Sequence, residues 1–472
     1  MTLRDDETIV ALATAPGRSA LALIRLSGAR AMDIARALGV PALIARRATR
    51  VRLRHPVHGE PLDDVVVIWY AAPRSSTGDD VVEFSTHGGA VVPVQVVAAC
   101  VAAGARPADP GEFTWRAVRH GRLDLLQAEA IGDLIEARTV AAQRQALHAL
   151  DGGLSRRLLA LRDEVIALEA LLAYDVDFPG EDDGPIAPSR IAAAADALAA
   201  SLRSLLATAP RGAVRRDGVL VVIAGPPNAG KSSLFNALLG ETRAIVTPTP
   251  GTTRDAIEGL LDRAPWPLRL VDTAGVRDTA DPIEQLGIEV AHRYLAQAMV
   301  VLACGATPDA VAQTMVALAP HAGGRLIPVR TKYDLLGDVA DAADVAQASR
   351  AAVPHAGFPA PIGFPAPMAV SAETGEGLGA LLQGIDAAVE QTLHGDGVLS
   401  TADAVITRER HRTGVQRALE EVEAFQAVWG TIPSPIAASH LLGAREAISE
   451  LIGTVETEEI LGRVFSSFCI GK

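Results

Sequence analysis

The sequence predicts a multidomain protein with an α+β N-terminal domain, an α-helical domain from two chain segments, and an α/β domain inserted between those segments. Its 472 residues exceed what one hydrophobic core usually holds. Short β-rich runs mix with helices near the N-terminus, whereas later strands alternate with amphipathic helices and have helical segments on both sides. We expect an N-terminal domain, a first helical segment, the inserted domain and a second helical segment over residues 1–121, 122–216, 217–390 and 391–472.

The composition is typical of a globular protein. Hydrophobic residues make up 49% and charged residues 21% of the chain. No apolar run reaches the ~18 residues that a membrane span needs, and the opening MTLRDDETIV lacks the layout of a signal peptide. Cys100, Cys304 and Cys469 form no CxxC pattern, so neither a disulfide framework nor a structural zinc site is expected. We therefore expect a cytoplasmic protein with no membrane span.

The charges are unevenly distributed. The net charge of −13 argues against broad, non-specific binding of nucleic acid. Residues 1–54 nevertheless contain ten arginines and four acidic residues, for which a solvated surface is the simplest interpretation. Only three of the 43 basic residues are lysines, namely Lys231, Lys332 and Lys472. These positions are candidates for roles that require a compact ammonium group.

The periodicity of apolar residues predicts the elements of the first two domains. In the N-terminal domain we expect strands at Val65–Tyr70 and Val81–Ser85 and a helix at Val91–Ala103. Beyond Leu123 the pattern becomes helical, with an apolar seam that the Gly152–Gly153 pair is expected to kink or interrupt. The residues of this seam are Leu147, Leu150, Leu154, Leu158, Leu161, Val165, Leu168 and Leu172. A turn over 175–185 precedes an alanine-rich helix that ends at about 207.

The inserted domain is expected to contain a parallel sheet covered on both faces, because its apolar strands alternate with helices. The predicted strands are Val219–Ala224, Leu268–Val271, Met299–Ala303, Leu326–Val329 and Met368–Val370. The Gly- and Pro-rich stretch at 354–367 is interpreted as an insertion loop.

A phosphate-binding loop (P-loop) follows the first of these strands. Residues 225–232, GPPNAGKS, match the pattern G-x-x-x-x-G-K-[ST] and lie directly between an apolar strand and a helix. Backbone N–H groups of such a loop surround the β-phosphate, while Lys231 reaches the β- and γ-phosphates and Ser232 binds Mg²⁺. Lys231 is therefore a predicted catalytic residue as well as a ligand-binding one.

Two further motifs complete a predicted nucleotide site. Asp272-Thr273-Ala274-Gly275 follows a strand, where the aspartate can hold Mg²⁺ through water and the glycine can sense the γ-phosphate. Between this motif and the P-loop, Thr253 offers a second hydroxyl for Mg²⁺. In Thr331-Lys332-Tyr333-Asp334 the carboxylate of Asp334 can accept from both N1–H and N2–H of guanine, so it selects GTP over ATP.

The inserted domain is thus predicted to be an α/β P-loop GTPase domain. Ser371-Ala372-Glu373 would present a backbone N–H to guanine O6, and Thr331, which stands where asparagine is usual, is expected to brace its loop more weakly without loss of specificity. The predicted GTP-binding residues are Asn228, Ala229, Gly230, Lys231, Ser232, Ser233, Thr247, Thr252, Thr253, Asp272, Thr273, Ala274, Gly275, Thr331, Lys332, Asp334, Ser371 and Ala372. Val276 replaces the water-orienting glutamine of Ras-type enzymes, and no arginine finger is evident.

Over nearly its whole length the chain resembles the MnmE/TrmE family of bacterial and organellar tRNA-modification GTPases. The likeness is carried by TIVALATAPGRSALALIRLSG, EFSTHGG, PGEFTWRA, LDLLQAEAIGDLI and the terminal FCIGK. The resemblance implies a homodimer that acts with an FAD-containing partner of the MnmG (GidA) type, as a heterotetramer, on the wobble uridine (position 34) of certain tRNAs. An aminomethyl or carboxymethylaminomethyl group would be added at C5.

The one-carbon unit would come from 5-formyl- or methylene-tetrahydrofolate. The resemblance assigns folate contacts to Arg25, Glu83, Arg122 and Lys472, with Arg122 in place of the more usual lysine. It also makes Cys469, within C-x-G-K, a candidate catalytic residue, although a thiol this near the terminus is as often incidental. Cys100 and Cys304 lie in apolar runs and are expected to be core residues.

The resemblance also implies a substitute for the missing glutamine and arginine. The amide oxygen of Asn228 can bind a monovalent cation beside the β–γ bridge, and the family suggests K⁺, completed by the loop from Thr247 to Thr252 when two GTPase domains dimerise on GTP. The predicted metal ligands are Ser232 and Thr253 for Mg²⁺, and Asn228, Thr247, Thr249 and Thr252 for K⁺. Glu284 is the predicted water-orienting residue.

Two other classes of protein were weighed against this one. A non-modifying assembly GTPase of the ribosome-maturation type would lack residues 1–120 and the C-x-G-K tail. A P-loop kinase is disfavoured by Asp334 and by the absence of an acceptor-binding lid in the sequence.

Overall fold

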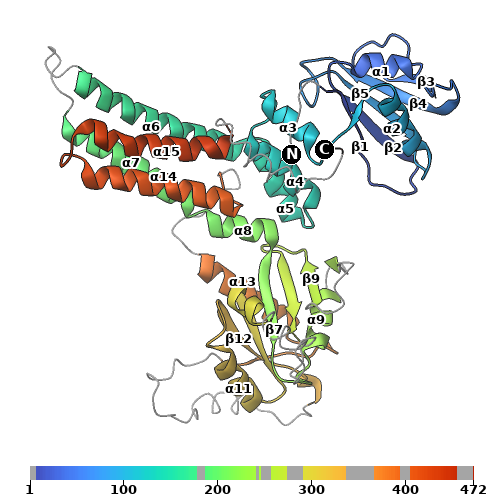
Figure 1. Cartoon of the computed structure of the whole chain (residues 1–472). Coiled ribbons are helices and arrows are strands. Elements are labelled where there is room, and N and C mark those ends of the chain that lie inside the picture. The colour runs from blue at the N-terminus through green and yellow to red at the C-terminus, as the bar shows by residue number, and fades with distance from the viewer. Residues whose placement is uncertain are drawn as a thin grey trace, which may run out of the picture. The chain divides into compact units, whose positions relative to one another are not determined.

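The computed structural model describes residues 7–177, 187–240, 244–245, 257–273, 291–335, 366–393, 404–453 and 471. The chain forms two compact units (Figure 1). One comprises Met1–Ile135, His148–Arg203 and Thr413–Lys472, and the other comprises Glu136–Leu147 and Ser204–Arg412. The expected fold class, an α+β domain, a helical domain and an inserted α/β domain, is confirmed.

The first unit begins with a six-stranded sheet in the order β3-β4-β5-β2-β1-β6. Its neighbouring strands are antiparallel, except that β6 is parallel to β1. The strands are β1 Ile9–Leu12, β2 Leu21–Ser27, β3 Thr49–Arg54, β4 Pro61–Tyr70, β5 Val81–His87 and β6 Arg106–Pro107. The two strands predicted from the sequence correspond to parts of β4 and β5.

One face of this sheet is covered by helices α1, Ala31–Ala37, and α2, Val92–Ala102. Alternate strand residues such as Ile24, Phe84 and Val67 are fully buried there together with Cys100. The prediction that Cys100 is a core residue is confirmed. The residues between them point to the opposite face, because side chains alternate along a strand.

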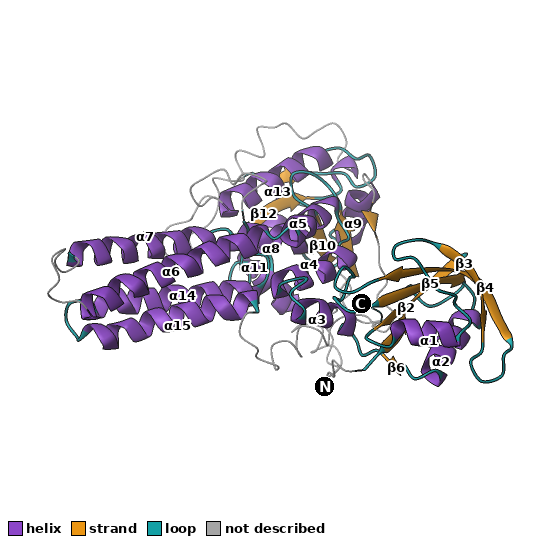
Figure 2. Ribbon diagram, turned by 90° about the horizontal axis from the view of Figure 1, so that it is seen from above, coloured by secondary structure: helices purple, strands orange, loops and turns teal. Residues whose placement is uncertain are grey.

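Helices α3 Glu112–Arg119, α4 Leu125–Glu136 and α5 Val140–Leu150 follow the sheet. Beyond them, α6 Gly153–Asp177 and α7 Pro188–Leu206 lie side by side with α14 Glu409–Val428 and α15 Ser434–Ile452 (Figure 2). The helical domain is therefore assembled from two separate chain segments, as predicted.

The apolar seam is confirmed only in part. Its residues from Leu154 to Leu172 are buried in the helical bundle. The helix is interrupted at Gly152, as expected, but Leu147 precedes the interruption and is 42% exposed, so it does not belong to the seam. The spacing of the apolar residues by three and four positions continues through the break at Gly152. Such spacing does not reveal where a helix changes direction.

One helical stretch in the described part of the chain, Pro188–Asp217, is long and apolar enough to cross a membrane by length and composition. Its apolar residues Ile191, Leu198 and Leu202 are fully or almost fully buried against protein. A core helix of a bundle meets the same criteria, so this stretch is weak evidence for a membrane span.

The second unit contains a seven-stranded sheet in the order β13-β12-β11-β7-β10-β9-β8. The strands are β7 Val219–Ala224, β8 Ala244–Ile245, β9 Ile257–Leu261, β10 Leu268–Asp272, β11 Val300–Gly305, β12 Arg325–Arg330 and β13 Met368–Ala369. The five predicted strands are present and mutually parallel. Two strands that were not predicted, β9 and β8, extend this parallel sheet with antiparallel pairing.

Both faces of this sheet are covered. Val221 and Ile223 of β7 pack against α9, Lys231–Gly240, and α13, Leu378–Leu393. Leu220 and Val222 face the opposite side, where the helical residues 291–297 contribute Leu295. On that side α11, Pro308–Leu318, packs against β11 through Val311 and Met315. Because β7 is buried on both faces, the loop that follows it starts from a fixed position.

Candidate nucleotide-binding site

The P-loop connects β7 to α9 and leaves the sheet through a tight turn. Gly225 has φ of +156°, and a Cβ atom there would lie 2.3 Å from the carbonyl oxygen of Cys304. Only glycine therefore fits at this position. Asn228 adopts a left-handed conformation with φ of +61°, and its side chain is exposed. The backbone is thus already curled in the manner of a phosphate-binding loop.

Lys231 lies inside this curl. Its ammonium group donates to the carbonyl oxygens of Gly225 at 2.8 Å and Pro226 at 2.9 Å. Burial lowers the pKa of Lys231, while the negative charge of Asp272 acts in the opposite direction. A buried ammonium group that donates to neutral carbonyls is well placed to exchange them for phosphate oxygens.

The second motif lies beside the first. The hydroxyl of Ser232 donates to Oδ2 of Asp272 at 2.6 Å, and Asp272 is 1% exposed at the end of β10. Parallel strands β7 and β10 are neighbours, so their carboxyl ends bring these two residues together. Adjacent hydroxyl and carboxylate oxygens are the ligands that Mg²⁺ prefers, so this pair fits the metal that the sequence predicts. The hydroxyl of Thr273 donates instead to the carbonyl of Ile223.

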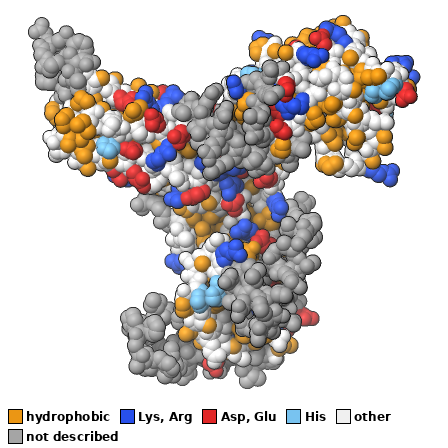
Figure 3. Space-filling model, viewed as in Figure 1, with side chains coloured by type: hydrophobic (Ala, Val, Ile, Leu, Met, Phe, Trp, Pro, Cys, Tyr) orange, Lys and Arg blue, Asp and Glu red, His pale blue; other side chains and the backbone are white. Residues whose placement is uncertain are grey.

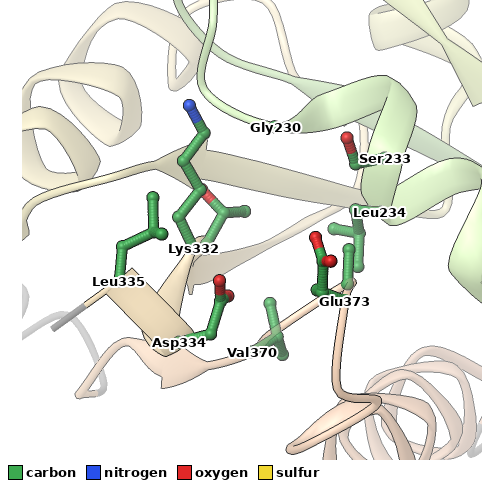
Figure 4. Close-up of a pocket in the computed structure, with 10 residues that line it drawn as sticks. Gly230, Ser233, Leu234, Lys332, Asp334, Leu335, Val370 and Glu373 are labelled. Carbon is green, nitrogen blue, oxygen red and sulfur yellow. The ribbon is translucent and has the colours of Figure 1, made fainter. Parts of the chain in front are cut away.

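A pocket of about 230 Å³ lies between the ends of β12 and β13 and the start of α9 (Figure 4). The carboxylates of Asp334 and Glu373 point into the space between Lys332 and Leu234. The lining residues are Gly230, Ser233, Leu234, Thr331, Lys332, Asp334, Leu335, Val370, Ala372 and Glu373. The pocket is thus a half-apolar slot with acidic acceptors, which suits a flat base that carries N–H donors.

Asp334 is positioned by a residue that the sequence placed on a different loop. The hydroxyl of Ser371, which is fully buried, donates to Oδ1 of Asp334 at 2.7 Å. The same Ser371 oxygen accepts from the backbone N–H of Thr374 at 3.1 Å. Oδ1 is therefore held by the protein, and the carboxylate is fixed in the direction of the pocket.

Thr331 connects this pocket to the P-loop. Its hydroxyl lies 2.5 Å from the carbonyl oxygen of Ala229 and 3.2 Å from that of Gly305. Its backbone N–H donates to the same Gly305 oxygen at 2.9 Å. Threonine at this position therefore braces the base-recognition loop directly. Whether it does so more weakly than asparagine stays a prediction.

The structure gathers most of the predicted GTP-binding residues that it describes around one site. Gly230, Ser233, Thr331, Lys332, Asp334 and Ala372 line the pocket, and Ala229 and Ser371 are hydrogen-bonded to Thr331 and Asp334 of its lining. The other described members lie in the P-loop or at the end of β10, namely Asn228, Lys231, Ser232, Asp272 and Thr273. Leu234, Leu335, Val370 and Glu373 also line the pocket but were not predicted to bind. Leu335 and Glu373 directly follow predicted residues, and that adjacency was the only available signal.

Several predicted residues lie outside the described part of the chain. These are Thr247, Thr249, Thr252, Thr253, Ala274, Gly275, Glu284, Cys469 and Lys472. Their assignments to Mg²⁺, K⁺, GTP, catalysis and folate stay predictions, as do the roles of the residues that the structure does describe.

The predicted folate contacts lie in the first unit. Arg25 on β2 and Glu83 on β5 are direct cross-strand partners, and their side chains form an ion pair at 2.7 Å. Arg122 is exposed just beyond α3. Gly471 is buried against this domain, since a Cβ atom there would lie 2.4 Å from the carbonyl oxygen of Leu12. Leu12 is next to Ala11, the β1 partner of Arg25, so Gly471 lies at the same part of the sheet.

Comparison with known proteins gives matches along nearly the whole chain. Residues 8–122 match a family model described as the GTP-binding protein TrmE N-terminus, and residues 125–469 match one described as the MnmE helical domain. A tRNA modification GTPase MnmE from Azoarcus sp. (strain BH72) is 39% identical, covering 99% of each chain. The protein of that description from Methylobacterium radiotolerans is 41% identical over 100% of each chain. The solved G domain of the T. maritima FeoB iron transporter aligns at 26% identity with a TM-score of 0.27, covering 36% of this chain and 97% of that one.

Proposed function

The chain belongs to the MnmE/TrmE family of tRNA modification GTPases, and we propose that it couples GTP hydrolysis to modification of the wobble uridine of certain tRNAs. In this proposal it acts as a cytoplasmic homodimer with an FAD-containing partner of the MnmG type. An aminomethyl or carboxymethylaminomethyl group is added at C5, with the carbon supplied by tetrahydrofolate. The observation that carries the GTP half of this proposal is the tie between Thr331 and Ala229, which joins a base pocket to a phosphate loop in one site.

The base pocket supports guanine as the base. The carboxylate of Asp334 accepts from N1–H and N2–H of guanine, whereas adenine offers no such pair of donors. Because Ser371 already donates to Oδ1 of Asp334, the pocket discriminates by geometry as well as by charge. The N–H of Ala372 is assigned to O6, and the side chain of Lys332 packs on the base plane.

The phosphate loop supports a triphosphate with Mg²⁺. Ser232 and, in the sequence-based assignment, Thr253 supply hydroxyl ligands, and Asp272 acts through water. When bound, Mg²⁺ neutralises the charge that develops on the β- and γ-phosphates. Lys231 exchanges the carbonyl oxygens of Gly225 and Pro226 for phosphate oxygens. Because the phosphate oxygens are negatively charged, their hydrogen bonds to the ammonium group are stronger than those of neutral carbonyls.

Potassium is proposed as the substitute for an arginine finger. Asn228 is the one described residue of the proposed K⁺ set, and its side chain is exposed on a left-handed turn of the P-loop. When bound, K⁺ supplies positive charge at the β–γ bridge. Glu284 is proposed to orient the attacking water. Dimerisation of the GTPase domains on GTP completes this arrangement.

The folate site is proposed on the six-stranded sheet. Arg25 and Glu83 offer one cation and one carboxylate at 2.7 Å from each other, which suits a ligand with an anionic tail and a pterin edge of N–H donors. The burial of Gly471 against Leu12 supports a role for the C-x-G-K tail, with Lys472, Arg122 and Cys469, at the same site. Both 5-formyl- and methylene-tetrahydrofolate fit this chemistry.

Folate binding tests the proposal against the rival function of a non-modifying assembly GTPase. Equilibrium dialysis of the full-length protein with 5-formyl-tetrahydrofolate should show saturable binding that is lost in Arg25→Ala and in Glu83→Ala. GTP hydrolysis should be retained in both variants, since neither residue lies in the GTPase domain. Absence of saturable binding by the wild type would favour the rival function.

A further inference from the structure

The six-stranded sheet leaves part of one face accessible, at strands β3 and β4. Cross-strand register places Arg50 opposite Val66, Val66 opposite Ser85, and Ser85 opposite Leu23, so all four share one face. Arg52 lies opposite Asp64 on the same face. The side chains of Arg50 and Arg52 are 80% and 62% exposed, and Val66 is 41% exposed. The strand residues on the other face, beneath α1 and α2, are almost all buried. Phe113 of α3 covers the β1 end of this face, where Ile9 and Ala11 are buried. In the part of the chain that the structure describes, neither α1 nor α2 covers the end that β3 and β4 form.

A row of cations, rings and one carboxylate crosses this face. The guanidinium carbon of Arg46 lies 5.5 Å from the ring centroid of Tyr70, and that of Arg25 lies 5.8 Å from the centroid of Phe113. Arg25 and Glu83 join the two halves through their ion pair. The pKa of Tyr70 is raised by burial and then by the negative charge of Glu83 and a hydrogen bond to it. The row therefore connects the proposed folate pair to an aromatic ring beside it.

Arg46 is held in place before any ligand binds. It is a non-glycine residue with φ of +63°, a conformation that arginine rarely adopts. Its backbone N–H donates to the carbonyl of Trp69 at 2.7 Å, and its guanidinium donates to the carbonyl of Arg74. These bonds orient the guanidinium plane over Tyr70 and reduce the entropy that a ligand would lose in ordering it.

The charge of the face selects the kind of partner. Asp64 forms ion pairs with both Arg50 and Arg52, and Glu83 pairs with Arg25. With Arg46, four arginines thus face two carboxylates, an excess of positive charge on a chain whose net charge is −13. A second copy of this face would bring like charges together, which is unfavourable. A polyanion with exposed flat bases fits both the positive charge and the aromatic rings of this face. Its bases can stack on aromatic rings and on guanidinium planes, while its phosphates pair with arginine. In Figure 3 basic and acidic side chains are scattered among hydrophobic ones over the N-terminal domain, on the side visible in that view.

We propose that this face binds the single-stranded anticodon loop of the substrate tRNA, an inference that rests on the function proposed above. A base stacks on the Arg46–Tyr70 pair, and Arg50 and Arg52 bind phosphates of the loop. The wobble base then lies next to the Arg25–Glu83 pair, where the one-carbon donor is proposed to bind. The basic N-terminal stretch, which the sequence alone assigned to solvated surface, thereby acquires a function.

The test is fluorescence anisotropy of a labelled anticodon stem-loop with the full-length protein, titrated at several salt concentrations. The double variant Arg50→Ala/Arg52→Ala should bind more weakly, and the slope of log K against log salt should become shallower by roughly 1.4, for two phosphate contacts on a single strand. Tyr70→Ala should weaken binding by about 5- to 150-fold, whereas Tyr70→Phe, which keeps the ring, should bind as the wild type does.

Arg36→Ala is the matched control, because Arg36 lies on α1 over the other face and pairs with Asp33. It should leave both affinity and salt slope unchanged, and melting temperatures should show that every variant is folded. Wild-type affinity and slope in the double variant would overturn the inference without touching the folate and GTP assignments. So would a wild type that binds no RNA at low salt. A double variant that changes oligomeric state in sedimentation while it keeps its RNA affinity would identify the face as an interface between copies, and would also overturn it.

Discussion

The hydroxyl of Thr331 lies 2.5 Å from the carbonyl oxygen of Ala229, so the loop proposed to recognise the base is tied directly to the loop proposed to hold the phosphates. A second contact of the same hydroxyl, 3.2 Å from the carbonyl of Gly305, anchors both loops to the end of β11. Correct placement of one half of the nucleotide site therefore depends on the other half. Thr331 is 3% exposed, so water does not replace these bonds when they are lost.

Thr331→Val should lower both the stability of the GTPase domain and its affinity for GTP. The substitution removes the hydroxyl proton, so the carbonyl of Ala229 loses its donor while that of Gly305 keeps the backbone N–H of Thr331, a loss of about 1–3 kcal/mol. Thr314→Val is the control, because the hydroxyl of Thr314 is also buried but donates within α11 at 2.7 Å. Calorimetry should show that both variants are destabilised and that only Thr331→Val binds GTP more weakly. Equal GTP affinities would refute the coupling. If threonine braces less well than asparagine, Thr331→Asn should bind GTP more tightly than the wild type.

Asp334→Asn should shift base preference from GTP towards XTP, whose base reverses the hydrogen-bonding polarity at C2. Ser371→Ala is its matched control, since it removes the donor to Oδ1 but keeps the carboxylate. We expect Ser371→Ala to bind every guanine nucleotide about tenfold more weakly, with unchanged base preference. Competition binding with GTP and XTP measures both effects. Retention of full GTP affinity by Asp334→Asn would show that residues 331–334 do not bind the base.

Gly471→Ala should disable the C-terminal tail. Gly471 has φ of +98°, and the added Cβ would lie 2.4 Å from the carbonyl oxygen of Leu12. We expect folate binding and tRNA modification to fall as they would on deletion of residues 469–472, with GTP hydrolysis largely intact. Gly379→Ala, at a helical position with no atom within 4 Å of the new Cβ, should leave both activities unchanged. A parallel loss of GTPase activity in Gly471→Ala would indicate a structural tail instead.

GTP turnover should be much faster in KCl than in NaCl at equal ionic strength. The gain of ~10³–10⁵ that an arginine finger gives marks the scale of the effect. Asn228→Ala should remove the difference, and so should Asn228→Gly, which also lacks the amide but suits the φ of +61° at this position. If both variants lose the difference between the two salts, its cause is loss of the amide ligand and not backbone strain at residue 228. Glu284→Ala should reduce turnover with little change in GTP affinity. Equal rates of the wild type in the two salts would rule out the cation mechanism.

The sequence predicted those parts of the molecule that depend on local patterns. The strand β7 and the P-loop after it were predictable because an apolar run, a glycine-rich motif and a helix stand consecutively. Burial of Cys304 followed from its apolar neighbours, and the burial raises the pKa of its thiol to about 12. The antiparallel strand β9 was missed because its five residues, IEGLL, show neither strict alternation nor a continuous apolar run.

Contacts between distant segments could not be predicted. Arg25 and Glu83 were assigned to one site by family resemblance, but their direct pairing depends on the register between β2 and β5. A shift of that register by one residue would turn one of the two side chains to the opposite face. The position of Arg46 over Tyr70 likewise depends on a left-handed backbone at Arg46, which no local pattern announces. That these basic and aromatic side chains share one face is therefore apparent only when the register of the strands is known.

The central claim, that GTP hydrolysis by this chain drives modification of the wobble uridine, is tested most directly by mass spectrometry of tRNA. Position 34 would be analysed in a strain that lacks the gene and in the same strain complemented with the wild type or with Asp334→Asn. We predict that the C5 substituent is absent without the gene, is restored by the wild type, and is not restored by Asp334→Asn in cells that contain GTP but little XTP. An unchanged level of the modified nucleoside in the strain without the gene would contradict the claim.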